Sequence, residues 1–164
     1  MRAKRGVAVL VLAIGLAGCG SKFKTYDGPE VTRVVVMKEQ RQMYLMNEDR
    51  VLTQHEFELG FAPTGHKERE GDGRTPEGRY FIDRRNPNSE YHLSIGISYP
   101  NASDIAEAEA KGVSPGGDIF IHGTPRRFRR AGDDWTAGCI AISNSEMEDV
   151  YAMVRDGTPV DIFR

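Results

Sequence analysis

The chain has 164 residues, with 22 Lys and Arg against 24 Asp and Glu, which gives a formal net charge of −2. This weakly acidic balance excludes the strongly basic surface on which nucleic-acid binding depends, so no nucleic-acid partner is expected. The length and the 39% hydrophobic content fit one globular domain with a single core.

The N-terminus has the pattern of an export signal. Three basic residues among the first five precede the apolar run Val7–Ala17. Because this run is much shorter than the ~20 residues of a membrane-spanning helix, it predicts the apolar part of a signal peptide. Leu16-Ala17-Gly18-Cys19 is similar to the bacterial lipoprotein signal, in which the cysteine is lipidated and becomes the new N-terminus.

We therefore expect a signal peptide at 1–18, lipidation at Cys19, a tether at 19–30 and a folded domain at 31–164. An ordinary signal peptide cleaved near Gly18 and an uncleaved anchor are the alternatives. A lipid anchor would hold the protein at a membrane, since each buried methylene contributes about 0.8 kcal/mol. The implied location is the periplasm or cell envelope, and Gly20, rather than an aspartate, favours the outer membrane.

The first half of the domain is predicted to be β-structure. Val31–Met37 is a β-branched run typical of a buried strand, and Gln42–Met46 and Val51–Leu59 follow it as an antiparallel meander. Pro63–Gly78 has four glycines and no hydrophobic periodicity, which predicts a long surface loop. Long loops in compact domains commonly carry function.

The second half is predicted to contain further strands and two short helices. A helix is expected at Asp104–Lys111, capped by Asp104 or Ser103, and another from the capping box Ser143-Asn144-Ser145-Glu146 to about Val154. The strands are expected at Arg79–Asp83, His92–Tyr99, Asp118–His122 and Pro159–Phe163. The pattern predicts a mostly β (α+β) domain of mixed sheets or a β-sandwich, without the alternation of a doubly wound parallel fold.

Cys139 is the only thiol in the body of the domain, because the other cysteine is Cys19. In an oxidising compartment, an unpaired thiol is a liability unless it is buried or used. His122 ends a predicted strand upstream, and an imidazole within hydrogen-bond reach can take the thiol proton and hold the thiolate as an ion pair. A buried structural cysteine with a core histidine is the alternative reading.

Gly138, immediately before the thiol, favours the catalytic reading. An acyl-transfer intermediate has an oxyanion that needs about two N–H donors. A glycine at this position lets the backbone turn sharply, and the amides of Gly138 and Cys139 are the expected donors.

Several motifs along the chain resemble those of the L,D-transpeptidase (YkuD-type) family. They are Gly73-Arg74-Thr75-Pro76-Glu77-Gly78-Arg79-Tyr80, Tyr91-His92-Leu93-Ser94, Pro115-Gly116-Gly117-Asp118, Ile121-His122-Gly123 and Thr136-Ala137-Gly138-Cys139-Ile140. The resemblance covers roughly Val31 to Phe163. It implies an L,D-transpeptidase-like domain that needs no cofactor.

The resemblance also implies a function. Cys139 would attack a peptidoglycan stem peptide, expel D-alanine, and pass the acyl group from its thioester to an amine or to water. His122 would be the general base and acid, and the Gly123 carbonyl would orient its ring. Four positions are expected to contact substrate: Arg74, Trp135, Ala137 and Gly138.

This sequence departs from the commonest family pattern at two positions. Ala137 replaces a histidine, and Ala141 replaces an arginine that would contact a substrate carboxylate. A branch with Trp-Thr-x-Gly-Cys-Ile-Ala is similar and includes members that cleave peptidoglycan linkages. The alternatives are therefore an amidase or carboxypeptidase using the same acyl-enzyme, and a non-catalytic lipoprotein that binds the wall.

The remaining polar residues leave fewer expectations. The arginines between base and nucleophile either bind acidic stem peptides or form a solvated loop: Arg126, Arg127, Arg129 and Arg130. Asp133 and Asp134 are expected to be turn residues rather than a third catalytic group. His55, His66 and His92 lack the spacing of zinc ligands, so no metal site is predicted.

Overall fold

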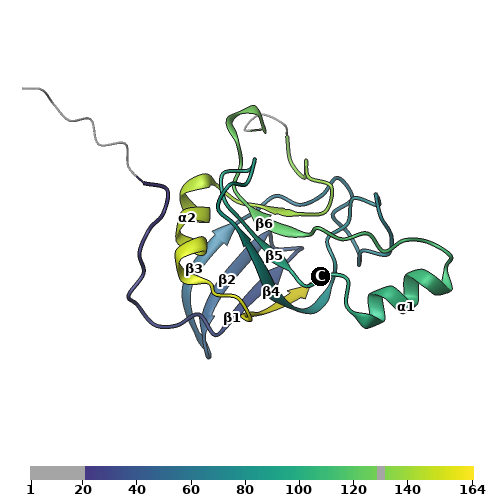
Figure 1. Cartoon of the computed structure of the whole chain (residues 1–164), viewed down its shortest axis with the longest axis horizontal. Helices are drawn as coiled ribbons and strands as arrows, with labels where there is room; N and C mark the ends of the chain where they lie inside the picture. The colour runs from purple at the N-terminus through teal and green to yellow at the C-terminus, as the bar shows by residue number, and fades with distance from the viewer. Residues whose placement is uncertain (1–20, 129–131) are drawn as a thin grey trace, which may run out of the picture.

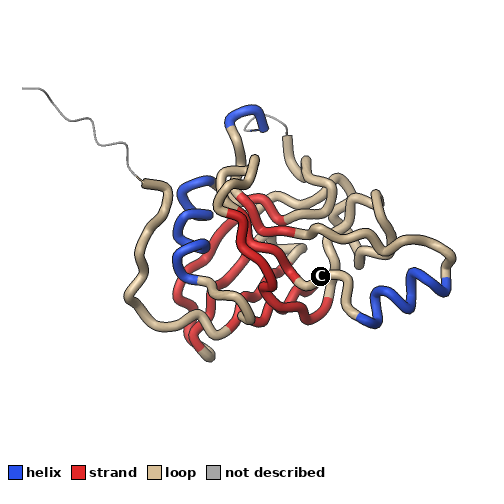
Figure 2. The backbone as a smooth tube through the Cα atoms, in the orientation of Figure 1, coloured by secondary structure: helices blue, strands red, loops and turns tan. Residues whose placement is uncertain are grey.

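The computed structural model describes residues 21–128 and 132–164, so the predicted signal peptide, Cys19, Gly20, Arg129 and Arg130 lie outside the described residues. The elements are β1 (Arg33–Met37), β2 (Gln42–Asn47), β3 (Arg50–Glu56), β4 (Gly78–Asn86), β5 (Ser94–Ile97), α1 (Ala102–Ala110), β6 (Phe120–His122), the 3₁₀ turn η1 (Arg126–Phe128), β7 (Ile140–Ala141), α2 (Asn144–Met153) and β8 (Pro159–Phe163). The mostly β fold class with two short helices is confirmed (Figures 1 and 2).

The described strands form one curled sheet in the order β3-β2-β1-β8-β4-β5-β6-β7. β1, β2 and β3 are the predicted antiparallel meander. β8 lies between β1, to which it is parallel, and β4, to which it is antiparallel. Beyond β3, Glu58 pairs with Ala141 of β7, so the two ends of the sheet meet. This closure brings the segment after β3 against the strand that follows Cys139.

Apolar residues of the sheet point into one core. Alternate residues of β1 and β2 are buried, as expected where one face of a strand meets the core. α2 packs beside β5 and β6 through Met147, Val150 and Met153 (Figure 1). The largest fully buried side chains include Tyr80, Leu59, Ile82, Ile95, Ile121 and Ile140.

The capping boxes fix the starts of both helices. The Ser143 hydroxyl oxygen accepts the N–H of Glu146, and the Glu146 carboxylate accepts the N–H of Ser143, as predicted for α2. The predicted cap of α1 was wrong, because Asn101 caps this helix. Asn101 accepts from the N–H groups of Ser103 and Asp104, and the buried Asp104 carboxylate accepts the Asn101 N–H.

Two predicted strand starts and one predicted loop also need correction. His92 (φ 74°) and Asp118 (φ 55°) adopt left-handed backbone conformations, so β5 and β6 begin two residues later than predicted. The segment Pro63–Gly78 lacks regular structure up to Gly78, where β4 begins, but it is not only a surface loop. Lys67 is 3% exposed and Thr75 is fully buried, which shows that part of this loop belongs to the interior.

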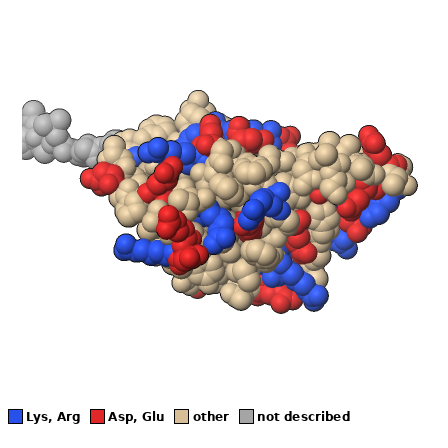
Figure 3. Space-filling view, turned by 90° about the horizontal axis from the view of Figure 1, so that it is seen from below, with Lys and Arg blue, Asp and Glu red and all other residues tan. Residues whose placement is uncertain are grey.

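The described part of the predicted tether, 21–30, lies along the domain beside α2 (Figure 1). Lys22 donates to the carbonyl of Pro87 at 2.6 Å, and Lys24 pairs with Asp149 at 2.8 Å. Basic and acidic side chains are intermingled on the face shown in Figure 3, in line with the small net charge. Among the described residues, neither helix has the length and apolarity needed to cross a membrane.

The cap of α2 is open to a stability test. Replacing Ser143 with Ala should lower the free energy of unfolding by about 1 kcal/mol, because the N–H of Glu146 loses its acceptor. Urea unfolding followed by circular dichroism measures this change. Ser145→Ala, two residues further along the chain, is the matched control, and it should change the stability by less than about 0.5 kcal/mol. Equal effects of both substitutions would contradict a capping role.

Candidate active site

The parallel pairing of β6 with β7 brings Cys139 and His122 together. Ile121 lies opposite Ile140 and His122 opposite Ala141, so Cys139 comes next to Phe120. Side chains alternate between the faces of a strand, which puts Cys139 and His122 on one face as diagonal neighbours. The sequence prediction that this loop returns the thiol to the histidine strand is therefore matched by the backbone.

The imidazole and the thiol have separate hydrogen-bond partners. His122 Nδ1 lies 2.8 Å from the Gly123 carbonyl oxygen, which can only accept, so Nδ1 carries the proton and Nε2 is the basic nitrogen. Cys139 Sγ receives the Phe120 N–H at 3.4 Å and lies 3.6 Å from the Asp118 carbonyl oxygen. Among the described residues, no hydrogen bond joins the thiol to the ring.

Burial keeps both groups neutral in the resting protein. It raises the pKa of the Cys139 thiol, against a smaller opposing effect of the Phe120 N–H. It also lowers the pKa of His122, although the hydrogen bond to Gly123 opposes this. The sequence-based expectation of a depressed thiol pKa was wrong for the resting state, because desolvation is the largest effect on the thiol and raises its pKa.

The turn before Cys139 is held by two threonines. Thr136 Oγ1 accepts the Gly138 N–H at 3.2 Å and donates to the Cys139 carbonyl at 2.7 Å. The buried Thr75 hydroxyl donates to the Gly138 carbonyl at 2.8 Å. Of the two amides expected to bind an oxyanion, that of Gly138 is thus occupied. The Cys139 N–H has no acceptor within the described part of the chain.

Glycine is required at this turn. Gly138 has φ 127°, a conformation that other residues rarely adopt, and an added Cβ would lie 2.6 Å from the Arg74 carbonyl oxygen. At Gly60, a Cβ would lie 2.0 Å from the Gly73 carbonyl oxygen and 2.7 Å from the Gly138 nitrogen. Three backbone segments therefore cross directly behind Cys139.

Aromatic rings surround His122. The Tyr91 ring centroid lies 4.4 Å from that of the imidazole, and the Trp135 ring lies 5.8 Å from it. Trp135 stacks on Phe128 with centroids 4.4 Å apart. Trp135 thus packs beside the histidine. Sequence reasoning quoted Tyr91 as part of a motif but did not assign it to the site.

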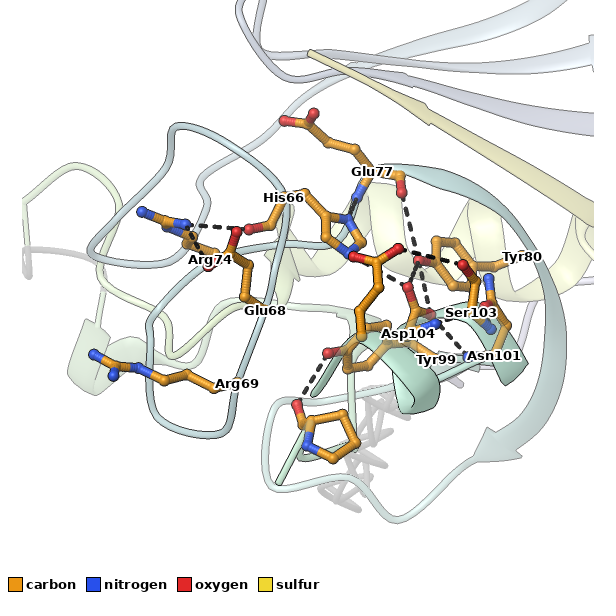
Figure 4. Close-up of polar contacts among 12 residues, drawn as sticks. His66, Glu68, Arg69, Arg74, Glu77, Tyr80, Tyr99, Asn101, Ser103 and Asp104 are labelled. Atoms are coloured by element: carbon orange, nitrogen blue, oxygen red, sulfur yellow. Dashed lines mark hydrogen bonds and ion pairs between the residues drawn. The ribbon is translucent and has the colours of Figure 1, made fainter. Parts of the chain in front are cut away.

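Two of the residues predicted to contact substrate, Trp135 and Arg74, line two different cavities. Trp135 and Ala141 line a groove of about 1280 Å³ that also reaches the start of α2. Arg74 instead lines a separate cavity of about 610 Å³, with Arg69 and Lys111. Its guanidinium points to Glu68 and the His66 carbonyl (Figure 4). Ala137 is exposed and Gly138 is buried between these regions.

The other charged residues have structural partners. Asp134 accepts the Leu59 N–H and pairs with Arg41, as a turn residue would. Arg127 lies over the Phe128 ring, 4.9 Å from its centroid. The remaining histidines each contact a carboxylate: His55 with Glu146, His66 with Asp104 and His92 with Glu148. Within residues 21–128 and 132–164, His, Cys, Asp and Glu form no group suited to a metal ion.

Two buried lysines support the loop at 63–78, a feature that the sequence analysis missed. Lys38 donates to the Gly65 and Thr75 carbonyls at 2.6 and 3.0 Å and pairs with Glu77. Lys67 donates to Asp72 at 2.9 Å. The only sequence signal for Lys67 was a charge within a glycine-rich segment, and such a segment is equally typical of a solvated loop. Lys38 lies outside this segment and gave no signal.

The resting protonation state of Cys139 is testable in a Cys19→Ser background, which leaves one thiol. The pH midpoint for alkylation by iodoacetamide should lie above that of the same thiol in urea, about 8.5, because burial disfavours the thiolate. The urea-unfolded protein is the control. A folded midpoint below the unfolded one would show an imidazolium–thiolate pair instead.

The loop should show a second pH dependence. Burial favours the protonated form of Asp72, but hydrogen bonds from Lys67 and three backbone N–H groups prevail and lower its pKa to about 2. Its stabilising effect is therefore complete above the unfolded pKa of about 3.9 and is lost as the pH falls through about 2. Asp72→Asn should destabilise the protein at pH 7 and progressively less below pH 4.

Urea unfolding at several pH values measures the effect of Asp72→Asn. Asp156→Asn, at an exposed position, is the matched control and should have little effect at any pH. A destabilisation by Asp72→Asn that does not change with pH would contradict this assignment.

Solved structures share this fold. The helical cell shape determining protein Pgp2 from Campylobacter jejuni is 28% identical, with a TM-score of 0.64 over 84% of this chain and 49% of that chain. Bd1075 from Bdellovibrio bacteriovorus is 23% identical, with a TM-score of 0.58 over 82% of this chain and 48% of that chain, a likeness of fold alone.

Sequence comparison adds a relative and a family. YafK of Escherichia coli K12, described as a candidate L,D-transpeptidase, is 33% identical over 92 residues, which are 55% of this chain and 32% of YafK. The match thus spans about a third of that relative. Residues 31–162 match the YkuD model of the L,D-transpeptidase catalytic domain. The chain belongs to the L,D-transpeptidase (YkuD) catalytic domain family.

Proposed function

We propose that this protein is a cysteine acyltransferase that acts on peptidoglycan stem peptides in cell-wall cross-linking or remodelling. The observation that carries the proposal is the placement of Cys139 and His122 on one face of the β6–β7 pair, with the ring oriented by the Gly123 carbonyl. The family match supports peptidoglycan transpeptidation as the class of reaction.

In the proposed reaction, Sγ of Cys139 attacks the carbonyl carbon of the third stem residue while Nε2 of His122 takes the thiol proton. The oxyanion receives the Cys139 N–H. The bond to D-alanine then breaks, the thioester forms, and His122 returns the proton to the leaving amine. An acceptor amine next attacks the thioester and loses its proton to His122, and the thiol is regenerated.

The neutral resting pair suits this sequence of steps. Desolvation raises the pKa of the half-buried Cys139 thiol, so we expect proton transfer to accompany attack on the carbonyl rather than to precede it. His122, with its pKa lowered by burial, is neutral and able to accept a proton at neutral pH. The hydrogen bond from Nδ1 to Gly123 then stabilises the imidazolium that forms.

The four residues predicted to contact substrate have different surroundings in the structure. Trp135 lines the larger groove beside His122, and we assign it and the exposed Ala137 to the peptide path. Gly138 shapes the turn that carries the donor amide. Arg74 faces the second cavity, where Glu68 partly neutralises it, so its contact with a substrate carboxylate rests on the family motif alone.

The proposed location is the cell-wall side of a membrane. Residues 1–18 would direct export, and Cys19 would carry the lipid that anchors the protein in the envelope. The partners are then stem peptides of the wall and, through the anchor, the membrane surface.

Water is the alternative acceptor. The Trp135-to-Ala141 stretch is similar to the branch that includes enzymes cleaving peptidoglycan linkages, and Ala141 removes an arginine from the wall of the groove. In that case the same thioester would be hydrolysed, and the protein would be an amidase or carboxypeptidase. A non-catalytic wall-binding lipoprotein is the third possibility.

Product analysis tests the proposal. Incubation of the protein with purified muropeptides should yield cross-linked or exchanged products by mass spectrometry, and Cys139→Ala should abolish them. If all products are shortened or detached peptides, the reaction is hydrolysis rather than transfer. A carbapenem should add covalently to the Cys19→Ser protein and fail to add when Cys139 is also replaced. If the Cys139→Ala protein makes the same muropeptide changes as the parent, the proposal of catalysis by Cys139 is wrong.

A further inference from the structure

We propose that Thr75 is a positioning residue, whose hydroxyl turns the Gly138–Cys139 peptide so that the Cys139 N–H faces the substrate as the oxyanion donor. This inference rests on the proposed acyl-transfer function. It begins from the fully buried Thr75 hydroxyl, which donates to the Gly138 carbonyl at 2.8 Å across 63 residues of sequence.

The geometry of one peptide plane links the two groups. The Gly138 carbonyl and the Cys139 N–H belong to the same peptide, which is trans. In a planar trans peptide, C=O and N–H point in opposite directions. A bond that holds the carbonyl toward Thr75 therefore directs the N–H away from Thr75. Without that bond, the peptide could rotate, because Gly138 imposes little restriction on its neighbouring dihedral angles.

The neighbouring contacts leave this amide as the donor. Thr136 Oγ1 occupies the Gly138 N–H at 3.2 Å and also holds the Cys139 carbonyl at 2.7 Å. The Cys139 N–H lacks an acceptor among the described residues. The two threonines thus fix the carbonyls on both sides of the Cys139 nitrogen and leave its proton for an incoming oxyanion.

Thr75 is itself held rigidly, as a positioning group must be. The Lys38 ammonium, 2% exposed, donates to the Thr75 carbonyl at 3.0 Å. On one side, the Arg74 N–H bonds Asp72 at 3.0 Å, and on the other, the Glu77 N–H bonds His66 Nδ1 at 3.0 Å.

The contacts that hold the Thr75 segment continue from His66 to α1. His66 Nε2 lies 3.3 Å from the buried Asp104 carboxylate, which also accepts the hydroxyl of Tyr80 (Figure 4). The long glycine-rich loop is thereby fixed to α1 and β4. We infer that its function at the site is to present one hydroxyl at a defined position.

The test compares two reactions of the same thiol in the Cys19→Ser protein. Acylation by a carbapenem passes through an oxyanion, whereas alkylation by iodoacetamide does not. Thr75→Val keeps the shape but removes the hydroxyl, and should slow acylation by about tenfold or more, since loss of one oxyanion donor costs 10²–10³ in rate. Alkylation should stay within about twofold, because the thiol itself is unchanged. Thr75→Ser, which retains the hydroxyl, should restore acylation.

Each other result overturns the proposal. If Thr75→Val slows both reactions equally, the residue supports the thiol rather than the oxyanion donor, and if it slows neither, the hydroxyl has no role. A parent protein that is alkylated but never acylated refutes the proposed function instead, so the two failures are distinguishable.

A measurement on the Cys19→Ser protein without a change at Thr75 covers the case in which Thr75→Val does not fold. By NMR, the Cys139 amide should exchange with solvent faster than the Gly138 amide, which is bonded to Thr136. Slower exchange at Cys139 would overturn the assignment.

Discussion

Three backbone segments cross behind Cys139 at distances that leave no room for side chains, and the site depends on this crossing. Gly60 follows β3, Gly73 lies in the long loop, and Gly138 precedes the nucleophile. The crossing forms where the two ends of the curled sheet meet, through the pairing of Glu58 with Ala141. The closure of the sheet and the geometry of the turn before Cys139 are thus linked at one place in the fold.

The polar interior around this crossing serves positioning rather than hydrophobic stability. Buried ammonium groups are costly unless they are paired. Lys38 has Glu77 and two backbone carbonyls as partners, and Lys67 has Asp72 and one backbone carbonyl. These contacts hold the loop at 63–78 in one conformation, because this segment has few strand hydrogen bonds to fix it. The loop is therefore ordered by electrostatics, while the strands beside it are ordered by apolar packing.

Sequence patterns were sufficient for much of the fold, because they report local physics. The meander, β8 and the Ser143 capping box follow from alternation, turn residues and capping chemistry. The His122–Cys139 pairing was also accessible, from an unpaired thiol beside a glycine. The Asn101 cap was missed because Asp104 satisfies the same local pattern while serving as the third residue of the box.

The parts that sequence reasoning missed depend on distant contacts. Nothing near Thr75 indicates that its hydroxyl meets Gly138, and Lys38 resembles any lysine at the end of a strand. The neutral state of the thiol was mispredicted for the same reason, since desolvation is set by whatever the fold packs around a group. Local pattern therefore indicated the candidate residues Cys139 and His122 but not the environment around them.

That environment bears on how a lone cysteine survives outside the cytoplasm, where this protein is proposed to act. Oxidants and disulfides react with the thiolate, and a thiol held in its protonated form is a poor target for both. The raised pKa of Cys139 then protects the sulfur from conversion to sulfenic acid and from mixed disulfides between turnovers. The same desolvation would thus slow the reaction of Cys139 with small oxidants and keep its proton in place until a substrate carbonyl is bound beside it.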